Sequence, residues 1–375
     1  MNLSYWEQKS WFSDIDFAIV GSGIVGLSCA LALRKKHPKK KIVVFEKGIL
    51  PSGASTKNAG FACFGSVSEI LEDLKTHSEE EVIQIIRGRI EGLKLLRETL
   101  GDHEIDYHEY GGYEVFSAAD EQLYEKCLSN LPYVNNLMKM AFYAEKGVFI
   151  VKNDPFSFKN TQKKLIFNQF EGQINTGMMM QALLKKAAEM DIFVINSVEI
   201  ESYLPKNGAI SIILNKNVEI SVKKLLLATN GFAKQLFKEE LQPARAQVLI
   251  TKPIKDLKIK GTFHLEKGYY YFRNIDDRIL LGGGRNLDFN AEETTELGLT
   301  ALVQNKLDEL LSTTILPGTA FEIESRWSGI MGVGGKKKPI VKKIDDHVYC
   351  GVRLGGMGVA IGSSIGKHMA ELVDS

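Results

Sequence analysis

Three glycines and one acidic residue near the N-terminus are spaced as a site for a nucleotide. In DFAIVGSGIVGLSCALALRKK, Gly21, Gly23 and Gly26 lie between a short apolar strand and a stretch with helical periodicity. A second strand, KIVVFE, ends at Glu46. Gly21 permits the tight turn, Gly23 lets a phosphate approach the backbone, and Gly26 lets the helix pack on the strand. Glu46 would accept hydrogen bonds from ribose hydroxyls, which predicts a dinucleotide without a 2′-phosphate.

A second loop of small side chains, GASTKNAGF at 53–61, follows Glu46. FAD lies extended, so its phosphates, ribityl chain and ring need a channel lined by backbone beyond the ribose site. NAD dehydrogenases usually continue from the acidic residue into an ordinary strand–helix unit. The loop therefore favours FAD, and an NAD-dependent dehydrogenase is the alternative.

Composition limits the remaining classes of function. The chain has 375 residues, 44% hydrophobic and 25% charged, which is typical of a folded protein of one large unit or two domains. Its net charge of +1 gives no reason to expect nucleic acid as a partner. No apolar run reaches the roughly 18 residues of a membrane span. The four cysteines lack disulfide-like spacing and the histidines lack metal-ligand spacing, so we expect a cytoplasmic protein with reduced thiols and no metal.

The second glycine loop resembles a motif of the flavoprotein family that contains D-amino-acid oxidase, glycine oxidase and sarcosine oxidase. Further stretches resemble this family in the same order along nearly the whole chain. They are EYGGYEVF (109–116), EGQINTGMMMQALLKKAAE (171–189), KKLLLATNGFAKQL (223–236), PARAQV (243–248), RILLGGGR (278–285), RWSGIMG (326–332) and VYCGVRLGGMGVAIGSSIGKHMAEL (348–372).

The resemblance implies an α/β fold with a Rossmann-type FAD-binding domain and a discontinuous, antiparallel-sheet substrate domain of the glycine-oxidase kind. The FAD-binding domain would comprise 1–80, 150–235 and 324–375, and the substrate domain 81–149 and 236–323. Periodicity independently predicts helices over 79–100 and 120–145, and short strands over 192–228 and after 243.

The resemblance also extends the predicted FAD site beyond the two loops. The backbone N–H groups of 354–359 would face the flavin ring, and the helix that follows would begin near it and stabilise negative charge on it. Sarcosine oxidases attach flavin to a cysteine shortly after the Trp motif, but this chain has none over 327–349, and Lys57 stands where other relatives attach it to a histidine. FAD is therefore predicted to be noncovalent. The predicted FAD-binding residues are Gly21, Gly23, Ile24, Val25, Gly26, Glu46, Lys47, Ala54, Ser55, Asn58, Ala59, Gly60, Phe61, Val198, Thr229, Gly231, Leu354, Gly355, Gly356, Met357, Gly358 and Val359.

Three residues are predicted to face the substrate. Tyr269, with Tyr271 two residues on, matches the family's substrate-domain tyrosine, although both could instead be packing aromatics. Met331 stands where amino-acid oxidases have the arginine that grips the substrate carboxylate. Arg353 would stabilise reduced flavin or replace that clamp, or else be a structural arginine bound to a carbonyl. Lys336, Lys337 and Lys338 form a solvated turn or a binding patch.

Together these features predict an FAD-dependent oxidoreductase, an oxidase or dehydrogenase. It would oxidise the C–N bond of a small amine or amino acid by hydride transfer to flavin N5, giving an imine that hydrolyses. Oxygen or a quinone would be the electron acceptor. A flavoenzyme that acts on an aminomethyl group of modified tRNA would carry the same flavin motifs, and so would a flavin-binding protein without turnover.

Overall fold

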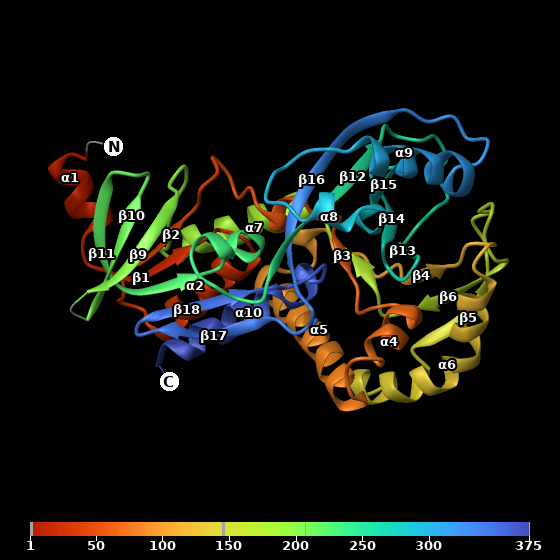
Figure 1. Cartoon of the computed structure of the whole chain (residues 1–375), viewed down its shortest axis with the longest axis horizontal. Helices are drawn as coiled ribbons and strands as arrows, with labels where there is room; N and C mark the ends of the chain where they lie inside the picture. The colour runs from red at the N-terminus through yellow and green to blue at the C-terminus, as the bar shows by residue number, and fades with distance from the viewer. Residues whose placement is uncertain (1–2, 145–146, 207, 375) are drawn as a thin grey trace.

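The strands of this computed structural model, which describes residues 3–144, 147–206 and 208–374, form two large sheets and one small sheet (Figure 1). Residues 1–2, 145–146, 207 and 375 lie outside the described residues. They include the two ends of the predicted FAD-binding domain and the last residue of the predicted helix 120–145. No helix within the described part of the chain is both long and apolar enough to span a bilayer.

The first sheet has a parallel centre that carries the nucleotide motif. Its main path runs β17-β18-β11-β1-β2-β8, in which β1 pairs in parallel with β2 and β11. Strands β1 and β2 and the last three residues of β11 are nearly continuous apolar runs because helices or strands cover both faces. The strands are β1 (Ile15–Val20), β2 (Ile42–Phe45), β8 (Phe193–Ile195), β9 (Ile200–Lys206), β10 (Ala209–Leu214), β11 (Val218–Leu227), β17 (Ile340–Asp345) and β18 (Val348–Val352).

The second sheet is mainly antiparallel and runs β16-β12-β15-β14-β13-β4-β6-β5. Among the described strands of this sheet, only β13 and β4 pair in parallel. It lies opposite the first sheet in Figure 1, where the long strand β16 reaches back toward the first. Its strands are β4 (Gly112–Val115), β5 (Phe149–Asn153), β6 (Lys164–Asn168), β12 (Gln242–Thr251), β13 (Thr262–Leu265), β14 (Tyr270–Ile275), β15 (Arg278–Gly283) and β16 (Ile323–Val333). The small sheet pairs β3 (Phe61–Ala62) with β7 (Gly172–Gln173).

Helices cover the sheets and approach one another closely at glycines. A Cβ atom at Gly366 would lie 2.5 Å from the Val25 carbonyl oxygen, and one at Gly92 would lie 2.3 Å from the Ala360 carbonyl oxygen. Three helices, α2, α5 and α10, thus pack at short range and fix the start of α10. The helices are α1 (Tyr5–Glu7), α2 (Ile24–Lys36), α3 (Ala54–Lys57), α4 (Val67–Asp73), α5 (Glu79–Leu100), α6 (Glu121–Phe142), α7 (Thr176–Glu189), α8 (Phe289–Glu292), α9 (Ala301–Leu310) and α10 (Gly358–Glu371).

The predicted mixed α/β class and helix positions are confirmed. Helix α5 spans the predicted 79–100, with Ser78 and Glu81 forming a capping box at its start. The predicted domain division stays a proposal. Its boundaries do not coincide with the division of the strands between the two large sheets. Strands β5 and β6 belong to the second sheet although the proposal puts 150–235 in the FAD-binding domain, and α5 packs on α10 although 81–149 was assigned to the substrate domain.

Candidate active site

A cavity of about 1610 Å³ lies between the two sheets and gathers residues from many segments. All the predicted FAD-binding residues line it except Gly26 and Gly231, which are packed against backbone. The three predicted substrate-facing residues, Tyr269, Met331 and Arg353, line it as well. Sequence analysis did not single out several other lining residues, among them Ser52, Glu69, Asn230, His264 and Arg285.

The first glycine loop joins β1 to α2 at one end of this cavity. Gly21 has φ of 101°, a conformation that favours glycine. A Cβ atom at Gly26 would lie 1.9 Å from the Gly21 carbonyl oxygen, so the helix approaches the strand as predicted. At Gly23 a Cβ atom would meet only the Ser55 side chain. The N-terminus of α2 therefore opens toward the cavity, as anion binding requires.

Glu46 is buried and ties the two glycine loops together. One carboxylate oxygen accepts from the Ser22 N–H (3.1 Å) and hydroxyl (2.7 Å). The other accepts from the Gly48 N–H (2.9 Å) and the Ser52 hydroxyl (3.1 Å). Each carboxylate oxygen already has two protein donors, so Glu46 shapes the loops in addition to any contact with a ribose.

The second glycine loop is held on several sides. The Ile24 N–H at the start of α2 donates to Ser55 Oγ at 3.0 Å, which links the loop to the first one. Trp327 on β16 donates its indole N–H to the Lys57 carbonyl at 3.0 Å. The buried Arg273 donates to the Ala59 carbonyl, and burial lowers its pKa to about 10, which still leaves it charged near neutral pH. The loop is thus a rigid wall of the cavity.

The turn before α10 forms an open cradle at the other side. Asn230 Oδ1 accepts from the backbone N–H groups of Arg353 (3.1 Å) and Leu354 (3.3 Å). A Cβ atom at Gly355 or Gly356 would meet nothing within 4 Å. The neighbouring Thr229 hydroxyl is buried and has no hydrogen-bond partner among the described residues. An orphaned polar atom beside open backbone fits a site that a polar ligand such as FAD completes.

Arg353 makes the contacts expected of a structural arginine. Its guanidinium donates to the Lys338 carbonyl at 2.9 and 3.1 Å and to the Glu240 carbonyl at 2.8 Å. It therefore fixes the 336–338 turn beside the cavity. Within that turn, Lys337 forms an ion pair of 2.6 Å with the buried Asp73 on α4.

The far end of the cavity is aromatic. Phe61 packs edge-on against Tyr271 and His264, with ring centroids 5.5 and 5.4 Å apart. Burial raises the pKa of Tyr271 to about 12, so its phenol stays neutral. Tyr269 is predicted on a strand but lies in the turn before it, since β14 begins at Tyr270. The turn has positive φ angles at 266–268, which delay the start of the strand. Arg285 lies over the rings of Tyr269 and Phe289, 5.8 and 5.1 Å from their centroids.

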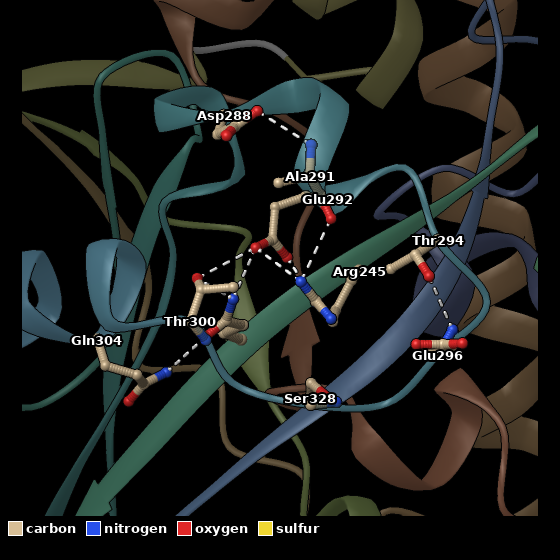
Figure 2. Close-up of polar contacts among 11 residues, drawn as sticks. Arg245, Asp288, Ala291, Glu292, Thr294, Glu296, Thr300, Gln304 and Ser328 are labelled. Carbon is tan, nitrogen blue, oxygen red and sulfur yellow. Dashed lines mark hydrogen bonds and ion pairs between the residues drawn. The ribbon is translucent and has the colours of Figure 1, made fainter.

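A buried polar network fixes the segment that covers this end (Figure 2). Arg245 on β12 forms an ion pair of 2.8 Å with Glu292, which is only 2% exposed. Gln247 donates to Glu292 and to Thr300, at 2.8 Å each, and the Gly298 N–H donates to Ser328 on β16 at 2.9 Å. Between these anchors, Thr295 and Leu297 line the cavity.

A buried carboxyl group near this end gives the first testable prediction. Desolvation raises the pKa of Glu114 on β4 from 4.5 to about 7, with Ser68 bonds opposing this and the Glu69 charge adding to it. Between these pH values the unfolded chain has released the proton that the folded chain still holds, so stability should fall as pH rises through this window. At pH 8, Glu114→Gln should be more stable than the parent by about 1–3 kcal/mol, and near pH 5 the difference should vanish.

Melting temperatures of the purified holoprotein at both pH values test this. Glu98→Gln is the matched control, because Glu98 is exposed on α5. A parent–variant difference that is the same at both pH values would contradict the raised pKa of Glu114.

Comparisons with known proteins agree with this geometry. A family model described as DAO, FAD dependent oxidoreductase, matches residues 16–372. The probable oxidoreductase OrdL of Haemophilus influenzae is 20% identical over 375 residues, covering 96% of this chain and 82% of its own. L-proline dehydrogenase from P. horikoshii and glycine oxidase from Geobacillus kaustophilus each superpose with a TM-score of 0.75. They are 18% and 17% identical to this chain. Each superposition covers 96% of this chain and 93% or 94% of the relative, respectively, and together with the TM-scores this shows a shared fold.

The family match decides between FAD and NAD, because members of this family depend on FAD. The predicted resemblance and the glycine-oxidase-like fold are both confirmed. The chain belongs to the DAO family of FAD-dependent oxidoreductases.

Proposed function

We propose that this oxidoreductase acts on the C–N bond of a small amine or amino acid. The observation that carries the proposal is one continuous cavity that joins the dinucleotide loops to an end lined by aromatic rings. Bound FAD would supply the oxidising chemistry by accepting a hydride at N5 from the carbon next to nitrogen, leaving an imine that water hydrolyses. The solved relatives include proteins described as glycine oxidase and iminodiacetate oxidase, which supports this class of substrate.

The chain's own residues would hold the cofactor in two places. The N-terminus of α2 and Gly23 would face the pyrophosphate, with Glu46 at the ribose. The open turn at Gly355 and Gly356 and the start of α10 would face the flavin ring, where the helix dipole stabilises negative charge. The orphaned Thr229 hydroxyl would find its partner on the cofactor.

Other residues would hold the substrate amine. The rings of Phe61, Tyr269 and Tyr271 would give the pocket its apolar walls. Glu69 lines the same space, where burial opposes ionisation but the charges of His264 and Lys337 lower its pKa. Its carboxylate is therefore ionised and would attract an amine carried in as an ammonium ion.

An acid group on the substrate would need a cation other than the family's arginine. Met331 occupies that position and offers no charge. The guanidinium of Arg353 is bonded to carbonyl groups, whereas that of Arg285 forms no hydrogen bond or ion pair with other described residues. Among the arginines that line the cavity, Arg285 is therefore the one that we assign to an acid group on the substrate.

The cofactor should be bound without a covalent link. Acid or heat should release FAD, and not FMN, from the yellow purified protein, because Glu46 and the first glycine loop serve the adenosine half that FMN lacks. Chromatography of the supernatant checks the identity of the flavin. Flavin that stays on the denatured chain would contradict noncovalent binding.

The substrate class is tested by adding a panel of amines and amino acids to the anaerobic holoprotein. Reduction by one class of amine should bleach the flavin absorption band. Including an aminomethyl-modified tRNA tests whether RNA is the substrate, and a flavin that no panel member reduces would contradict the proposed activity. Reoxidation with oxygen or with a quinone then identifies the electron acceptor. The four cysteines are free and buried, which supports a reducing, cytoplasmic location.

A further inference from the structure

Three buried side chains from distant segments converge at the wall of the cavity. Cys63 follows β3, Glu171 precedes β7, and His264 lies on β13. The Cys63 sulfur, a Glu171 carboxylate oxygen and a His264 ring nitrogen all lie within 4.8 Å of one another. All three residues are at most 7% exposed. Local histidine spacing did not predict this cluster, because it forms only when the small sheet meets the second sheet.

The surrounding structure fixes the orientation of each member. The Phe64 N–H donates to Glu171 Oε1 at 3.0 Å, which leaves Oε2 to face His264. Gly112 on β4 makes room for this carboxylate, since a Cβ atom there would lie 1.8 Å from Glu171 Oε2. The Phe61 ring packs edge-on against the imidazole. Such support of a ligand carboxylate is typical of built metal sites.

The distances suit a metal ion better than a direct hydrogen bond. His264 Nε2 lies 3.4 Å from Glu171 Oε2, whereas charge-assisted N–H···O bonds are about 2.7–2.9 Å. This buried nitrogen has no hydrogen-bond partner among the described residues. Around a tetrahedral zinc ion with bonds of about 2.0–2.2 Å, ligand atoms lie roughly 3.3–3.6 Å apart. The observed separation of 3.4 Å lies within this range.

We propose that Cys63, Glu171 and His264 bind one divalent cation of the zinc class. Thiolate, imidazole and carboxylate are the ligands that zinc takes. Zinc would displace the thiol proton of Cys63 and any proton on His264 into solvent, and the two negative ligands would balance its charge. Cys63 and His264 also line the cavity, so a fourth coordination position would be open to water or to a substrate group on that side.

Zinc binding can be measured without reference to amine oxidation. Holoprotein is stripped with a chelator, desalted and titrated with Zn²⁺, and bound zinc and protein are quantified by elemental analysis and calorimetry. We expect one zinc ion per chain. Cys63→Ala and His264→Ala should each weaken binding by at least about 100-fold, because even changes behind a ligand cost 10–100-fold.

Cys127→Ala is the matched control, since Cys127 is also free and buried but lies on α6. It should bind zinc like the parent, and flavin absorbance and melting temperature report whether each variant is folded. X-ray absorption at the zinc edge of the parent protein should show one sulfur neighbour beside nitrogen and oxygen. No stoichiometric zinc in the parent, a spectrum without sulfur, or folded Cys63→Ala that binds zinc normally would each overturn the proposal.

Discussion

A Gly23→Val variant should fold and yet lose FAD. The residue is the N-cap of α2, where the backbone faces the cavity and a Cβ atom would lie 2.8 Å from Ser55 Oγ. That oxygen accepts the Ile24 N–H, so a branched side chain would displace the link between the glycine loops and fill the space for the pyrophosphate. We expect colourless protein even after incubation with FAD, measured as flavin absorbance per chain.

Gly177→Val provides the control, because Gly177 is exposed on α7 and away from the cavity. Glu46→Gln should bind FAD more weakly by about 1–3 kcal/mol, since charge-assisted bonds are lost while the side chain keeps its size. If Gly23→Val retains a full complement of flavin, the dinucleotide site lies elsewhere.

Local sequence was sufficient for the nucleotide end of the cavity. The turn needs φ of 101° at Gly21, and the helix nearly touches the strand at Gly26, so both positions exclude other residue types. The spacing of these glycines therefore predicts the local backbone geometry. Glu46 follows directly at the end of β2, which fixes its direction. For the same reason, apolar periodicity located α5 correctly, and the structure adds the capping box at Ser78.

The substrate end was less predictable because its contacts join distant segments. The partners of Arg353 are carbonyl groups at 240 and 338, and no spacing in the sequence indicates them. Cys63 and His264 are about two hundred positions apart, so a search for local metal motifs passes over them. The resemblance identified Met331 as a departure from the family but could not indicate which other cation faces the cavity.

Arg285→Met should raise KM for amines that carry an acid group and leave uncharged amines much less affected. The guanidinium lies over the aromatic rings of Tyr269 and Phe289 at the cavity wall, with no hydrogen bond or ion pair to other described residues. A bidentate bond to a carboxylate contributes about 1.5–3 kcal/mol, so KM should rise roughly 10- to 150-fold for acidic substrates. Rates of anaerobic flavin reduction, measured against substrate concentration, give the limiting rate of reduction and the half-saturating substrate concentration separately.

Two further arginine variants make the assignment specific. Arg278→Met removes a cation from β15, the strand that precedes Arg285, but one that pairs with Glu324 outside the cavity, so selectivity should not change. Arg353→Met should lower the melting temperature, since two carbonyl groups lose their donors, without discriminating between acidic and uncharged amines. Met331→Arg should restore a charge at the family's position and shift preference toward α-amino acids. Acid-selective loss in Arg353→Met with none in Arg285→Met would show instead that Arg353 leaves its carbonyl partners to bind the substrate.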